Sequence, residues 1–98
     1  MFILNLEAYK RFHHYFSYLE GIGVYLKRGL IRPDLIDDFM STDVIVLWEK
    51  FQPYIYEARK RRNYPQYYEH FEYMYNQIKQ LYLKQHPELK DKTTTIVE

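Results

Sequence analysis

The sequence predicts an all-α protein, an up-down helical bundle of three long helices and one short helix. Three observations indicate this class. Apolar residues recur at spacings of three and four along most of the chain, cap and stop signals separate these stretches, and the alternation typical of a strand is missing from them. At 98 residues the chain has room for one domain, which we place at residues 1–86, followed by a flexible tail at residues 87–98.

The first helix is predicted over residues 4–28. Lys27 and Arg28 suit the negative end of the helix dipole, and Gly29 can take the left-handed conformation that ends a helix. The apolar stripe of this helix consists of Phe12, Phe16, Leu19, Gly23, Leu26 and Leu30.

The second, short helix is predicted over residues 33–40, because proline fits the first turn of a helix. We expect three of its residues to face inward: Leu35, Ile36 and Phe39.

The third helix starts at the N-cap cluster of residues 41–43 and ends in "EARKRRN". We expect a kink at Pro53, because the apolar stripe keeps its phase across this proline. The fourth helix is predicted over residues 65–86.

Composition limits the classes of function. The 12 Tyr and 6 Phe residues predict a core and a surface built largely from aromatic contacts, whereas a formal net charge of +1 gives no general reason to expect nucleic acid as a partner. The lack of cysteine excludes thiolate metal sites and thiol catalysis and fits a reducing compartment.

The N-terminus lacks a signal-peptide pattern, and the longest apolar run, "VIVLW", is far short of the roughly 20 residues of a membrane helix. We therefore expect a cytoplasmic protein without membrane insertion.

No catalytic, metal or cofactor site is predicted. Zinc ligands on a helix are typically two histidines at positions i and i+4, and no pair of histidines here has that spacing. The histidines are His13, His14, His70 and His86. Small helical ribonucleases of the toxin type have a shorter spacing between Arg and His than the one between Arg62 and His70. The longer spacing in this sequence argues against that enzyme class.

Two glycines inside the first helix require an explanation, because each costs about 1 kcal/mol against alanine. Gly23 lies on the apolar stripe, so we expect another helix to approach it closely, with the helix that contains the core anchors Trp48 and Phe51 as the candidate. Gly21 lies on the other face, between Tyr18 and Tyr25. We interpret these three residues as an interface for a second copy of the chain, since tyrosine is enriched at protein interfaces. The alternative is that tyrosine simply occupies half-buried surface positions.

A basic end of the bundle is the strongest electrostatic feature. The end of the third helix, "RKRR", should lie beside the start of the first in an antiparallel bundle. The candidate nucleic-acid-binding residues are Arg59, Arg61, Arg62 and His14. The alternative is a solvated helix end, because cations are expected there from the helix dipole alone.

Three segments resemble those of a known family. "YLEGIGVYLKRGLI", with "LWEKFQPYIYEAR" and "YYEHFEYMY" downstream, is similar in order and spacing to an uncharacterised family of small prokaryotic helical proteins, a domain of unknown function. The matching positions are Glu20, Ile22, Gly23, Lys27, Arg28, Gly29, Leu30 and Ile31, then Trp48, Lys50, Pro53, Ile55 and Arg59. The resemblance covers roughly residues 12–80. It implies a helical fold and brings no activity with it.

These observations favour a non-enzymatic, protein-interaction helical module that forms a homodimer or binds an unknown protein partner. The alternative is a nucleic-acid-binding regulator or weak nuclease that uses the basic end. A membrane-associated role rests only on the membrane-spanning segment that many relatives carry, and this chain has no apolar run of that length.

Overall fold

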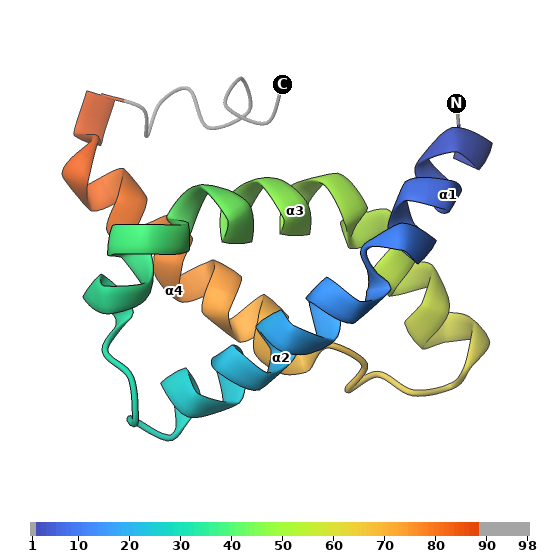
Figure 1. Cartoon of the computed structure of the whole chain (residues 1–98), viewed down its shortest axis with the longest axis horizontal. Coiled ribbons are helices and arrows are strands. Elements are labelled where there is room, and N and C mark those ends of the chain that lie inside the picture. The colour runs from blue at the N-terminus through green and yellow to red at the C-terminus, as the bar shows by residue number, and fades with distance from the viewer. Residues whose placement is uncertain (1, 89–98) are drawn as a thin grey trace.

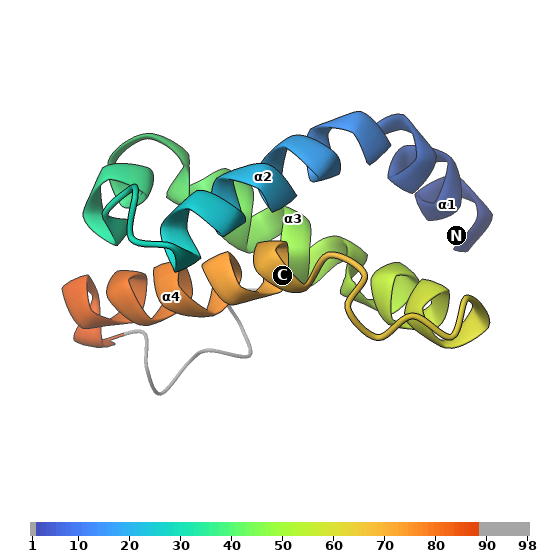
Figure 2. The same cartoon turned by 90° about the horizontal axis from the view of Figure 1, so that it is seen from below.

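The computed structural model describes residues 2–88, with the side chains of residues 6–88, and confirms the all-α class. The described part forms four helices and no strand: α1 (Phe2–Arg11), α2 (His13–Lys27), α3 (Pro33–Arg61) and α4 (Glu69–Gln85) (Figure 1). Both α2 and α4 lead towards the same end of the molecule, whereas α3 leads back in the opposite direction (Figure 2). This up-down order is expected of consecutive helices joined by short connections.

The first predicted helix is two helices. Phe12, with φ −89° and ψ 4°, separates α1 from α2, although the backbone hydrogen bonds continue on both sides of it. No local sequence signal marks this bend. Its physical reason is tertiary packing, because the ring of Tyr9 in α1 lies against Phe51 and Tyr54 of α3, at 6.1 and 5.5 Å between ring centroids.

The predicted short helix and third helix run together as α3. Their boundary is visible as a sharp turn at Met40, whose φ of −149° and ψ of 22° are not helical (Figure 1). The helix continues through Pro53, as predicted, but the kink expected at this proline is not marked by non-helical angles; the residue inside α3 with such angles is Met40. α3 ends with Asn63 in the left-handed region (φ 51°), and the amides of Asn63 and Tyr64 donate to the carbonyls of Lys60 and Arg59.

The fourth helix begins later than predicted, at Glu69 instead of Pro65. Residues 64–68 form turns, and Tyr68 immediately before the helix is left-handed, with φ 58°. The proline signal was therefore misleading here. What decides the start of the helix is a contact from α2, described below.

The core is aromatic. Three phenylalanines, one from each of α2, α3 and α4, meet there fully buried, with Phe16 5.4 Å from Phe51 and 5.8 Å from Phe71 between ring centroids. Trp48 is 1% exposed and meets Phe71 edge to face at 5.2 Å. Offset and edge-to-face contacts of this kind add about 0.5–1.5 kcal/mol per pair beyond the buried area.

Some apolar residues expected in the core are exposed. In the first part of α3 only Ile36 of the three predicted residues is buried, whereas Leu35 is 49% and Phe39 63% exposed. This segment is too short to bury more than one narrow stripe of side chains, which consists of Ile36 and Met40. Leu30 is 70% exposed, because the left-handed turn at Gly29 (φ 76°) takes it off the stripe of α2.

Residues 89–98, most of the predicted tail, lie outside the described residues, so the tail stays a prediction. Among residues 2–88 no helix combines the length and the apolar character needed to cross a membrane.

Candidate functional site

The "EGIG" segment of α2 is where α4 begins. An alanine Cβ built on Gly23 would lie 2.2 Å from the carbonyl oxygen of His70 and 2.6 Å from its carbonyl carbon. The close approach at Gly23 therefore comes from α4, and not from the helix that contains Trp48. A glycine is required because the atoms it meets belong to backbone, which cannot move aside as a flexible side chain can.

Glu20, one turn before Gly23, caps the start of α4. Its Oε1 accepts hydrogen bonds from the backbone amides of His70 (3.0 Å) and Phe71 (2.9 Å), and its Oε2 lies 2.6 Å from Nδ1 of His70. These amides belong to the first turn of a helix, where no intrahelical acceptor exists, and a carboxylate at this end also suits the dipole. Tyr68, at the N-cap, makes no side-chain cap of its own. Glu20 supplies that cap from another helix.

Arg59 holds the loop before α4 from the other side. Its Nε donates to the carbonyl of Tyr67 at 2.8 Å, and its guanidinium pairs with Glu72 at 2.9 Å. The guanidinium also lies over the rings of Trp48 and Tyr56, at 5.9 and 5.4 Å. The side chain is only 16% exposed. Arg59, a candidate for nucleic-acid binding, is thus occupied by contacts within the chain.

A second polar cluster joins α3 to α4. Glu49 accepts hydrogen bonds from the Tyr75 hydroxyl and the Lys79 ammonium group, and all three side chains are largely covered. Burial and the hydrogen bond to Glu49 raise the pKa of Tyr75, so its hydroxyl stays protonated at neutral pH. The cluster therefore joins α3 to α4.

The predicted interface residues form an exposed aromatic face on α2. Tyr18 is 57% and Tyr25 52% exposed, and a Cβ at Gly21 would meet no atom of the described residues within 4 Å. Tyr15 lies stacked on Tyr18, with ring centroids 6.0 Å apart, and its hydroxyl donates to Asp43 of α3 at 3.0 Å. Burial and this hydrogen bond raise the pKa of Tyr15 to about 12. The face is therefore held in place on one side by a contact to α3.

The basic end divides into paired and unpaired cations. Arg61 pairs with Glu57 at 2.9 Å, whereas Arg62 lies over the ring of Tyr67, 5.1 Å from its centroid. His14 is exposed on the first turn of α2. As expected for antiparallel neighbours, the end of α3 lies beside α1, and Arg62 lines a cavity with Lys10.

That cavity, of about 370 Å³, lies between α1, the start of α2 and the loop before α4. It is lined by Leu6, Tyr9, Lys10, His13, Arg62 and Tyr67. The hydroxyl oxygens of Tyr9 and Tyr67 are 3.3 Å apart, and Nδ1 of His13 is 3.0 Å from the hydroxyl of Tyr68. Burial and the hydrogen bond with Tyr67 raise the pKa of Tyr9, so its hydroxyl is a neutral donor or acceptor.

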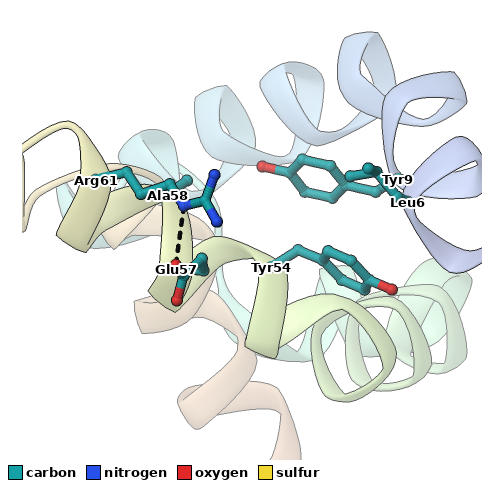
Figure 3. A pocket seen from close by; sticks show the side chains of 6 residues that line it. All are labelled: Leu6, Tyr9, Tyr54, Glu57, Ala58 and Arg61. Carbon is teal, nitrogen blue, oxygen red and sulfur yellow. Dashed lines mark hydrogen bonds and ion pairs between the residues drawn. The ribbon is translucent and has the colours of Figure 1, made fainter. Parts of the chain in front are cut away.

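A second hollow, of about 230 Å³, adjoins the first and shares Leu6 and Tyr9 with it. It is lined by Leu6, Tyr9, Tyr54, Glu57, Ala58 and Arg61, and its walls are mostly apolar (Figure 3). The rings of Tyr9 and Tyr54 lie one above the other, with their hydroxyls pointing in opposite directions, and the Glu57–Arg61 ion pair stands at one side.

Sequence reasoning missed the role of Glu20 and both hollows. The signal for Glu20 was its position three residues before Gly23, on the side of the helix next to the apolar stripe. The hollows depend on the bend at Phe12, for which the sequence carries no signal. No group of three or more His, Asp or Glu side chains that could hold a metal ion occurs among the described residues.

Comparison with known proteins gives one family. A family described as "Domain of unknown function (DUF4760)" matches residues 3–78, which cover α1 except its first residue, all of α2 and α3, and α4 as far as Ile78. Among curated proteins and among solved structures there is no match. The match spans most of the chain and both segments that contain Glu20 and Arg59, and the chain therefore belongs to the DUF4760 family, whose function is unknown.

Proposed function

We propose that this chain is a non-enzymatic helical module that acts by association and forms a homodimer through the exposed aromatic face of α2, in the cytoplasm. The observation that carries the proposal is Gly21. A glycine inside a helix costs about 1 kcal/mol against alanine, and no contact with the described part of the chain requires one at this position. A partner helix could approach α2 closely at this position, because glycine has no side chain.

A second copy fits this face because the arrangement is complementary to itself. Tyr18 and Tyr25 lie about one turn before and after Gly21, so two α2 helices related by a twofold axis can cross at Gly21 with each tyrosine packed beside the glycine of the other copy. Tyrosine is suited to such a surface, since its ring buries area while its hydroxyl keeps a polar partner. A formal net charge of +1 gives little repulsion between copies.

Two further observations support an association role over catalysis. The carboxylates that could serve in acid–base chemistry, Glu20, Glu49 and Glu72, are engaged in contacts that hold α4 in place. The chain also has no cysteine nucleophile, which is in keeping with the proposed reducing compartment.

Sedimentation equilibrium from low to high micromolar concentration tests the homodimer. We expect the wild-type chain to shift from monomer to dimer over this range, and the double variant Tyr18→Ser/Tyr25→Ser to remain a monomer with unchanged helical circular dichroism. Tyr64→Ser is the matched control, because Tyr64 is 49% exposed but lies outside the face. A wild-type monomer at every concentration, or equal loss of dimer in the Tyr64 variant, would contradict the proposal.

Nucleic-acid binding through the basic end is the second candidate. It has less support, because Arg59 and Arg61 are paired within the chain, and of the four candidate residues Arg62 and His14 remain. Phosphate contacts are strongest at low salt. If the chain binds neither single-stranded DNA nor RNA at low salt, this candidate is eliminated.

A further inference from the structure

The two adjoining hollows at the α1 end differ in chemistry. The larger one has three side chains that carry or can carry positive charge, Lys10, His13 and Arg62, together with the hydroxyl of Tyr9. The smaller one offers Leu6, Ala58 and the faces of two phenol rings. Because Leu6 and Tyr9 line both, a single molecule can occupy the two hollows at once.

Among the described side chains, residues 6–88, none pairs with the two permanent cations of the larger hollow. Neither Lys10 nor Arg62 has an ion-pair partner among the described side chains, although Arg32, Arg59, Arg61 and Lys79 each have one. The guanidinium of Arg62 lies over the Tyr67 ring, an arrangement in which its N–H donors can bind an anion. His13 uses Nδ1 towards Tyr68, so its Nε2 can also face a ligand.

We propose that the two hollows form one binding site for a small aromatic phosphate. The phosphate group binds Lys10, Arg62 and His13 in the larger hollow, with the protonated hydroxyl of Tyr9 as a further donor. The ring enters the smaller hollow between Tyr9, Leu6 and Ala58. A volume of about 370 Å³ for the larger hollow is within the usual range for small-molecule pockets, which combine apolar walls with a few convergent polar groups. This site is separate from the α2 face and does not depend on the homodimer.

Phosphate is favoured over other anions by the donors present. A guanidinium presents parallel N–H groups that match two phosphate oxygens, and an ammonium adds a second charge, so the pair suits a dianion. The Glu57 carboxylate in the smaller hollow does not oppose this, because Arg61 pairs with it at 2.9 Å (Figure 3). The aromatic walls, with Tyr9 and Tyr54 stacked at 5.5 Å, favour a flat ring over a branched chain.

Titration of the isotope-labelled full chain with phenyl phosphate, followed by amide chemical shifts, tests the site. We expect saturable shifts at Tyr9, His13 and Arg62. Inorganic phosphate and phenol, which each fill one hollow, should bind at least about tenfold more weakly than phenyl phosphate, as expected when one half of the contacts is lost. Binding of inorganic phosphate as tight as that of phenyl phosphate would overturn the proposal, because the smaller hollow would then not be used. Absence of saturable shifts would overturn it as well.

Three variants locate the binding. Arg62→Gln should weaken phenyl phosphate about tenfold, the effect of losing a charged hydrogen bond. Ala58→Leu should weaken it by filling the smaller hollow while leaving every charge in place. Lys60→Gln is the matched control, because it removes the same charge from the same end of the helix but lies outside both hollows. If Lys60→Gln weakens binding as much as Arg62→Gln, the attraction is diffuse surface charge and the site is refuted.

Discussion

Replacement of Gly23 by alanine is expected to lower the free energy of unfolding by about 3 kcal/mol, at the upper end of overpacking effects. The added Cβ would lie 2.2 Å from the carbonyl oxygen of His70, a separation that real Cβ atoms do not adopt. This steric clash can be relieved only if the whole of α4 moves away from α2. That movement would also lengthen the hydrogen bonds from Glu20 to the first turn of α4, so the cost extends beyond one contact.

The matched control is Gly21→Ala, two residues away on the same helix. Within residues 6–88 a Cβ at Gly21 meets no atom within 4 Å, so alanine should raise the free energy of unfolding of the monomer by about 1 kcal/mol through helix propensity. Urea unfolding followed by circular dichroism, at a concentration where the chain is monomeric, measures both. The account of the two glycines is wrong if both variants change stability in the same direction.

Replacement of Glu20 by alanine is expected to cost about 2–3 kcal/mol, the range for leaving partly buried donors without their charged acceptor. The amides of His70 and Phe71 would lose their acceptor, and Nδ1 of His70 would lose its partner at 2.6 Å. Tyr68, the residue at the N-cap, makes no cap of its own that would remain after the substitution. The effect should appear in urea unfolding as a lower midpoint with an unchanged slope.

Two variants separate capping from general charge effects. Glu20→Gln keeps an oxygen that can accept from the His70 and Phe71 amides, so it should lose less stability than Glu20→Ala. Glu7→Ala removes an exposed carboxylate on α1 and should change stability by less than about 0.5 kcal/mol. Equal losses in Glu20→Ala and Glu7→Ala would show that the cap contributes nothing specific.

The sequence predicted the features that depend on local chemistry. Gly29 has the left-handed φ of 76°, and the amides of Gly29 and Leu30 donate to the carbonyls of Leu26 and Tyr25, as the stop signal requires. The boundary after residue 40 appears at Met40, next to the N-cap cluster. Periodicity also identified the buried anchors Trp48 and Phe51, because both lie on a stripe that repeats along the helix.

Features that depend on which helices become neighbours were not predictable. Helical spacing shows that Gly23 lies on the buried face, but not that α4 is the helix that covers it. The role of Glu20 as an acceptor was not predicted, since it depends on where α4 starts. The start of α4 was itself predicted wrongly, because the signal at Pro65 is local whereas the cap that fixes Glu69 as the first residue comes from α2. The bend at Phe12, and therefore both hollows, follows from the packing of Tyr9 on α3.

The segments that resemble the family are explained largely by the placement of α4. Glu20 caps the helix, Gly23 admits its backbone, and Arg59 holds the loop that precedes it. Trp48 of α3 packs against Phe71 and Tyr75 of α4. Surfaces that act on other molecules are therefore to be sought outside these positions, at the Tyr18–Tyr25 face and at the hollows beside α1.

Amide hydrogen exchange at His70 and Phe71 tests most directly the claim that the "EGIG" segment of α2 holds the start of α4. First-turn amides of a helix normally lack an intrahelical acceptor and exchange quickly. In the wild-type chain we expect both amides to be protected as strongly as the middle of α4, and we expect this protection to be lost in Glu20→Ala while the middle of the helix stays protected. Fast exchange of both amides in the wild-type chain would contradict the account.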